Sequence, residues 1–160
     1  MREKILTFIE KNSRVELKEL ATLLGMSEAD VANELEAMEQ EGIICGYHTL
    51  IDWDKVTTER INAVIEVRVT PQRDMGFDAV ARRIYRFDEV KSVYLMSGSY
   101  DLLVLVQART LKELASFVAS KLSPLEMVTG TATSFVLKRY KEEGVVFENE
   151  DADRRLVISP

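Results

Sequence analysis

The sequence contains a single cysteine, Cys45, and a single histidine, His48, three residues apart. Thiolates and imidazoles are the usual zinc ligands, but a structural zinc site takes four of them. A lone cysteine cannot form an internal disulfide, and no Ser-His-Asp set is available around one histidine. We therefore expect no metal site, no cofactor and no catalytic residue. We interpret Cys45 as a small apolar side chain and His48 as a surface residue.

A second group of residues with binding chemistry is Gly-Ser-Tyr-Asp at 98–101. A glycine lets a ligand approach the backbone closely, and Asp101 supplies an anion. The same residues also suit a plain hairpin turn, since glycine tolerates positive φ and aspartate can bond its own backbone. Thr131 and Thr133 offer hydroxyls, although threonine is first of all a good strand former. From the residues alone, both interpretations stay open.

The charge of the chain is unevenly distributed. The 160 residues hold 21 Lys and Arg against 27 Asp and Glu, a net charge of −6. Residues 1–50 carry five basic and ten acidic side chains, net −5, and the remainder carries 16 against 17, net −1. From Glu19 to Asp54 there are nine acidic residues and no Lys or Arg. No stretch is apolar enough for a membrane span or a secretion signal, so we expect a cytoplasmic protein without membrane contact.

Apolar spacing predicts three short helices before Gly42. Their apolar positions are Ile5, Phe8 and Ile9, then Leu17, Leu20, Ala21 and Leu24, then Val31, Leu35 and Met38 with Ala32 at the margin. Gly25 breaks the second helix, and the Ser27 hydroxyl can accept an early backbone N–H of the third. Two helices joined by a tight turn at Gly25 predict a helix-turn-helix domain over 1–50.

The rest of the chain predicts a second domain. From Ile43 the apolar spacing becomes that of a strand, and 51–62 is a hinge. Further on, the pattern predicts a strand at 63–69 closing at Pro71, a helix at 77–85, strands at 90–96 and 102–106, a helix at 111–122 and a long strand at 128–140. This order is the split βαβ of a ferredoxin-like fold over 63–141, so the fold class is α+β. Residues 142–160 form a charged extension with short apolar islands at 145–147 and 156–158.

Four segments, in this order, resemble the Lrp/AsnC family of bacterial and archaeal transcriptional regulators. They are Glu19-Leu-Ala21 through Gly25-Met-Ser27, residues 39–47, the Gly-Ser-Tyr-Asp-Leu of 98–102, and residues 131–138. The resemblance implies a DNA-binding regulator that responds to an amino acid or similar small effector. It also implies a homodimer made by pairing the ferredoxin-like sheets, which often assembles further to an octamer.

The resemblance implies where each ligand binds. The DNA-binding candidates are Arg14, Lys18, Ser27, Glu28, Ala32, Asn33 and Glu36. The effector candidates are Gly98, Ser99, Asp101, Thr131 and Thr133. A zwitterion needs both an anion and a set of donors, which Asp101, the backbone N–H groups at 98–99 and the threonine hydroxyls would provide.

One departure from the family concerns the third helix, where the family usually carries basic residues. An acidic recognition helix opposes close approach to phosphates, although glutamate can accept from cytosine N4. Cations elsewhere must then hold the DNA, either Arg14 and Lys18 or Arg2 and Lys4. The alternative function is a metabolite-binding or assembly protein whose acidic helix-turn-helix contacts another protein.

Enzymatic activity has a precedent in siroheme decarboxylases, whose architecture resembles this family. Such activity would be expected to use histidine and arginine at the ferredoxin-like pocket. The only histidine here, His48, precedes that domain, so we do not expect an enzyme.

Overall fold

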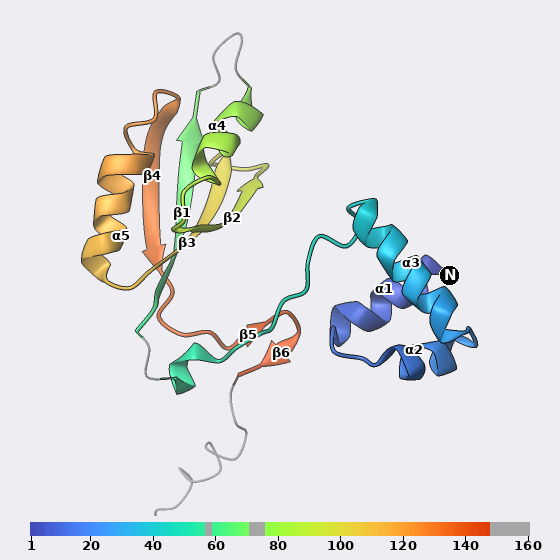
Figure 1. The fold of residues 1–160 in the computed structure, drawn as a ribbon. Helices are drawn as coiled ribbons and strands as arrows, with labels where there is room; N and C mark the ends of the chain where they lie inside the picture. The colour runs from blue at the N-terminus through green and yellow to red at the C-terminus, as the bar shows by residue number, and fades with distance from the viewer. Residues whose placement is uncertain (57–58, 71–75, 148–160) are drawn as a thin grey trace, which may run out of the picture. The chain divides into compact units, whose positions relative to one another are not determined.

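A computed structural model describes residues 1–56, 59–70 and 76–147. The chain divides into two compact units, Met1–Ile51 and Asp52–Pro160, each of which is described by itself. Figure 1 shows three helices in the first unit and a sheet with two helices in the second. Within the described residues, no helix has the length and apolar character needed to cross a membrane.

The first unit is built from α1 (Arg2–Lys11), α2 (Leu17–Leu24) and α3 (Glu28–Gln40), as the apolar spacing predicts. Its core consists of Ile5, Leu20, Ala21, Val31 and Met38, with partly buried neighbours that include Ile9, Leu24 and Leu35. Phe8 and Leu17 differ from the expectation, since each is 40% exposed. Both lie beside the buried stripe of their helix, which three short helices are too small to cover completely.

The turn between α2 and α3 has the geometry that its residues predict. Gly25 lies in the left-handed region with φ 66°, which glycine adopts without steric cost. The N–H of Met26 donates to the carbonyl of Ala21 at 3.0 Å and so closes the end of α2. The Ser27 hydroxyl accepts from the N–H of Asp30 at 3.1 Å, which confirms the predicted cap. The helix-turn-helix is therefore fixed by local chemistry.

The strand expected from Ile43 onward is not formed. The described residues between α3 and the first strand of the sheet contain only a 3₁₀ turn, Trp53–Lys55, and Tyr47 and Leu50 are exposed. An alternating pattern makes a strand only where a neighbouring strand accepts its hydrogen bonds and a core covers one face. Within the described residues this segment has no partner strand, and only its start, at Ile44, packs on the helical core, so the prediction from spacing was wrong.

The second unit has the predicted order of strands and helices. Its elements are β1 (Ile61–Val69), α4 (Phe77–Ile84), β2 (Val90–Leu95), β3 (Leu102–Ala108), α5 (Leu111–Phe117), which continues as a π-helical turn, Val118–Leu122, and β4 (Val128–Phe135). The sheet has the order β2-β3-β1-β4 with every pair antiparallel. This is the ferredoxin-like arrangement, and it confirms the α+β class.

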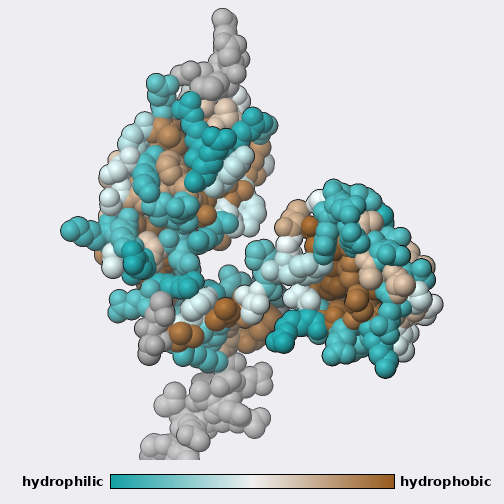
Figure 2. Space-filling view, viewed as in Figure 1, coloured by the Kyte–Doolittle hydropathy of each residue, from teal (hydrophilic) through white to brown (hydrophobic). Residues whose placement is uncertain are grey.

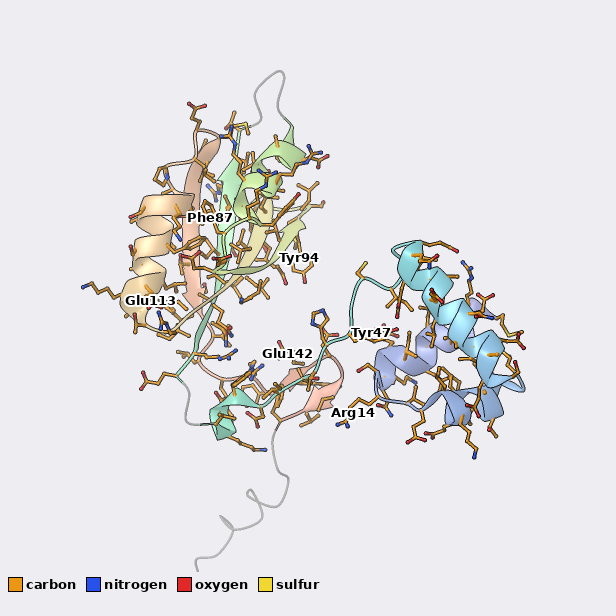
Figure 3. All side chains as sticks on the ribbon, in the orientation of Figure 1. Arg14, Tyr47, Phe87, Tyr94, Glu113 and Glu142 are labelled. Atoms are coloured by element: carbon orange, nitrogen blue, oxygen red, sulfur yellow. The ribbon has the colours of Figure 1, made fainter. Side chains whose placement is uncertain are left out.

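Both helices of this unit pack on the same face of the sheet. The buried residues of β1 and β3 alternate along each strand and form one cluster with Val80 and Ile84 of α4 and Leu114 and Phe117 of α5. The intervening residues point to the other face, where Val64, Leu103 and Leu105 are only partly buried. Tyr94 lies opposite Leu103 in the register and is 51% exposed (Figure 3). Among the described residues of one chain, nothing therefore covers the second face of the sheet.

The last described segment departs from the predicted long strand. Strand β4 ends at Phe135, which pairs with Ala63 near the start of β1, so the chain beyond it has little of β1 left to pair with. Instead, β5 (Lys141–Glu142) and β6 (Val145–Val146) form a small hairpin, within which the predicted extension of 142–160 begins. The predicted strand end at Pro71 and the apolar island at 156–158 lie outside the described residues.

Candidate DNA-binding and effector sites

The helical unit presents most of the predicted DNA-binding residues to solvent. Arg14 is exposed in the turn before α2, and Lys18 is exposed in the first turn of that helix. Ser27, Glu28, Asn33 and Glu36 are exposed at the start and along α3, whereas Ala32 is partly buried. The structure thus places them on two consecutive helices and their connecting turns.

Several carboxylates of α3 already have partners within the helical unit. The Arg2 guanidinium, at the start of α1, donates from Nε to Glu34 at 2.8 Å and from Nη1 to Glu41 at 2.7 Å. The Tyr47 hydroxyl donates to Glu39 at 2.7 Å. These contacts join α3 to the N-terminus and to the segment that follows it.

The partners shift the acid–base equilibria of these groups. The hydrogen bond from Arg2 lowers the pKa of Glu41 below its ordinary value of 4.5. The same pairing raises the pKa of the Arg2 guanidinium. The hydrogen bond to Glu39 raises the pKa of Tyr47, because the phenol proton is held by a carboxylate. Arg2 is therefore engaged with α3, which leaves Arg14 and Lys18 as the better candidates for phosphate contacts.

The predicted effector turn is tied to the central strand of the sheet. The Asp101 carboxylate accepts the N–H of Val69 through Oδ2 at 2.7 Å, and the Asp101 N–H donates to the carbonyl of Val67 at 3.0 Å. A Cβ added to Gly98 would meet nothing within 4 Å, and Gly98 is not in the left-handed region. The hairpin therefore does not require a glycine at this position, and the space beside Gly98 is open.

Thr131 and Thr133 lie elsewhere on the sheet. They are opposite Val67 and Ile65 in the register, and both of those residues are buried beneath the helices. On the other side of β1, Val67 pairs with Leu102, the residue after Asp101. Two strand spacings, about 10 Å, therefore separate Thr131 from Leu102 across the sheet. Within one chain the structure brings 98–101 together but does not bring these hydroxyls to the turn.

A groove lies at the end of the β2–β3 hairpin opposite the 98–101 turn. It is an open groove of about 1040 Å³ that includes Arg60, Glu89, Lys112 and Lys121 in its lining. Lys121 donates to Glu89 Oε1 and lowers the pKa of that carboxyl. The spacing of the predicted ligand residues did not indicate this groove, because its lining comes from segments scattered between residues 59 and 121.

Comparison with known proteins agrees with this two-part architecture. The sequence model described as winged helix-turn-helix DNA-binding matches residues 1–44, and the model described as Lrp/AsnC ligand binding domain matches residues 62–146. The chain belongs to the Lrp/AsnC family of DNA-binding transcriptional regulators. The resemblance noted from its motifs is thereby confirmed.

One curated relative and two solved structures extend the comparison. The chain is 47% identical over 158 residues to the uncharacterized HTH-type transcriptional regulator YugG of Bacillus subtilis, covering 98% of this chain and 95% of the relative. A crystal structure of the transcriptional regulator NMB0573 from Neisseria meningitidis, in complex with L-Met, has a TM-score of 0.70 at 26% identity, covering 88% and 90% of the two chains. The crystal structure of PH0061 has a TM-score of 0.76 at 21% identity, covering 90% and 95%.

The Arg2 contacts lead to a prediction about the stability of this Lrp/AsnC protein. Replacing Arg2→Gln should lower the melting temperature of the helical unit, because Glu34 and Glu41 lose their shared counter-charge. Since the pKa of Glu41 is lowered in the folded state, its contribution is present above the unfolded value and is lost as pH falls through the folded one. Thermal melts followed by circular dichroism at a series of pH values from about 7 to about 3 test this.

Lys4→Gln is the matched control, since Lys4 is an exposed cation on the same helix. It should leave the melting temperature nearly unchanged. Equal melting temperatures for wild type and Arg2→Gln at neutral pH would show that the pairing contributes nothing to stability.

Proposed function

We propose that this regulator binds DNA with α3 in the major groove and with Arg14 and Lys18 on the phosphate backbone. The observation that carries the proposal is the intact α2-turn-α3 geometry, closed at Gly25 and capped by Ser27. Phosphate contacts position a protein without selecting sequence, whereas side chains on α3 such as Asn33 and Glu36 can contact base edges. Residues 1–50 would then bind DNA, and 63–141 would bind the effector.

The competing function is an acidic helix-turn-helix that binds a protein instead of DNA. The net charge of −5 over residues 1–50 favours it. Against it, Glu34, Glu39 and Glu41 already have donors within the unit, so the acidic character available to a partner is smaller than the sequence suggests. DNA binding is the better supported of the two.

We further propose that the effector is an amino acid or similar zwitterion bound beside residues 98–101. Asp101 would accept the ammonium, and the backbone N–H groups at Gly98 and Ser99 would meet the carboxylate. The open space at Gly98 supports this, since the hairpin itself needs no glycine there. Because β1 lies between the turn and Thr131 or Thr133, and because these threonines share the helix-covered face with Val67 and Ile65, we expect those hydroxyls to come from a neighbouring protomer of the larger assembly.

A second protomer is also expected from the uncovered face of the sheet. Val64, Leu103, Leu105 and Tyr94 leave apolar surface there that a facing sheet would bury. We propose a homodimer formed by this face, with assembly to an octamer as a further step. We propose that this homodimer binds its ligands and does not catalyse a reaction, since the only histidine, His48, lies outside the effector unit, Asp52–Pro160. We place it in the cytoplasm.

The DNA prediction concerns Arg14 and Lys18. Reversing both charges, Arg14→Glu with Lys18→Glu, should weaken binding to every DNA sequence alike, because phosphate contacts carry no sequence information. Glu36→Lys should raise non-specific affinity and steepen the salt dependence. Fluorescence anisotropy on the duplex upstream of its own gene and on an unrelated duplex, at two salt concentrations, measures both. Loss of binding in Glu36→Lys would instead give that carboxylate a direct recognition role.

The effector prediction concerns Asp101. Asp101→Asn keeps an oxygen for the N–H of Val69 but removes the charge, so affinity should fall roughly tenfold or more, from a loss of about 1.5 to 3 kcal/mol. Calorimetry against the twenty amino acids measures this. Gly98→Ala is the companion variant, which should fold normally but bind less tightly. If an amino acid bound the Asp101→Asn variant with undiminished affinity, the proposed site would be wrong. The groove at Glu89 and Lys121 would then be the next site to test.

The assembly prediction concerns the uncovered face. Leu103→Glu should shift the full chain toward smaller species, because it places a charge in the proposed apolar interface. Leu111→Glu, at an exposed residue that begins α5, is the control with the same change of charge. Sedimentation velocity at micromolar concentration measures both. A wild-type chain that sediments as a monomer would contradict the proposed homodimer.

A further inference from the structure

We infer that Arg82, Arg83 and Arg86 form a second DNA-contact surface, on the effector unit, which binds the phosphate backbone. The inference rests on the proposed DNA binding and extends it to a part of the chain outside the helix-turn-helix. Phosphate, and not a base edge, is the chemical group recognised.

The packing of α4 sets the direction of this surface. Val80 and Ile84 are buried against the sheet, and they hold the opposite side of the helix toward solvent. Arg82 and Arg83 are exposed in the last turn, and Arg86 is exposed just beyond it. Residues three and four positions apart are neighbours on a helix. Arg86 follows Arg83 by three positions and Arg82 by four, so it lies next to both just beyond the end of α4. Tyr85, 55% exposed, lies among them.

These guanidinium groups have no partner within the described residues. None of them takes part in an ion pair or side-chain hydrogen bond with the parts of the chain that the structure describes, and residues 82–86 include no acid. A second cationic group, at 138–141, behaves differently. There Arg139 pairs with Glu142 and lies over the ring of Phe147. Among the described residues, one cationic group therefore has an acidic partner and the other has none.

The three arginines bring like charges together at the C-terminal end of α4. Like charges three and four residues apart on a helix repel one another. The helix dipole favours cations at this end but does not distinguish arginine from lysine. Arginine differs in its planar fork of donors, which matches phosphate oxygens in pairs.

The charge distribution of the chain points to DNA as the occupant. The helical unit is net negative, and Arg2, one of its five cations, is used within it. A DNA-binding protein of this kind needs phosphate contacts from elsewhere. The acidic α3 of another copy is the competing occupant, but Glu34 and Glu39 on that helix, and Glu41 at its C-cap, already have donors. DNA offers a continuous row of unpaired anions instead.

The experiment compares two full-chain variants with the same loss of charge. The first replaces Arg82, Arg83 and Arg86 with glutamine. The control replaces Lys91, Lys112 and Lys141, exposed cations of the same unit, with glutamine. Binding to the duplex upstream of its own gene and to a mixed-sequence duplex is measured between about 50 and 200 mM salt.

The arginine variant should bind both duplexes roughly tenfold or more weakly at the lower salt. Its slope of log affinity against log salt should be shallower by about 2 to 3, since each lost phosphate contact removes about 0.9. The control should change the slope by less than about 1. A third variant, with lysine at all three arginine positions, should retain most of the slope and so show that the surface acts through its charge.

Each other result overturns the inference. If the wild type binds neither duplex, both the proposed DNA binding and the inferred arginine surface are wrong. If the wild type binds and the arginine and control variants weaken alike, DNA binding stands but the surface does not. If the arginine variant keeps its DNA affinity and sediments as a smaller species, the three arginines bind a second copy of the chain.

Discussion

The fold of the second unit, Asp52–Pro160, depends on β1, because this strand is hydrogen-bonded to β3 on one side and to β4 on the other. Its alternate residues Ala63, Ile65, Val67 and Val69 form the middle of the core beneath the helices. A strand that directs these residues inward must direct the others to the opposite face. The core and the uncovered face are therefore two consequences of one alternation, and a sequence that builds the first also creates the second.

The turn at residues 98–101, proposed to bind the effector, is attached to the same strand. Asp101 accepts from the N–H of Val69 and donates its own N–H to Val67, so a ligand that pulls on its carboxylate also acts on the end of β1. The uncovered face proposed to join protomers is built on that strand. This is a direct physical route by which an effector could favour one state of assembly, since a ligand shifts an equilibrium only toward the state that it binds better.

Features that depend on neighbouring residues could be predicted from the sequence. Gly25 and Ser27 define the helix-turn-helix by chemistry within a few residues, and the alternating runs of the sheet gave the order of strands and helices. Features that join distant residues could not. Arg2 contacts Glu34 and Glu41 across 32 and 39 positions, and nothing in its spacing distinguishes it from a free surface cation.

The same limit explains why the strand predicted from Ile43 is absent, and why Thr131 and Thr133 lie apart from residues 98–101 within one chain. Thr131 and Thr133 share a sheet with the effector turn, but only the strand order shows that β1 lies between them. The segment after Ile43 has the spacing of a strand, yet a strand exists only when a second one accepts its hydrogen bonds. Periodicity describes one chain segment, whereas pairing is a property of two.

The negative charge of the recognition helix also bears on specificity. Specificity is a difference between the affinities for right and wrong sites, and it can be gained by weakening the wrong ones. In the proposed complex, Glu28 and Glu36, both exposed on α3, would repel phosphates at every site, whereas Glu36 would gain a hydrogen bond only where a cytosine N4 meets it. If cations away from α3 supply the general attraction, the recognition helix is free to discriminate between sequences. A basic recognition helix combines both tasks and so binds more tightly to every sequence. When cations elsewhere attract the phosphates and α3 only recognises the bases, the affinity for non-specific DNA falls more than the affinity for the correct site.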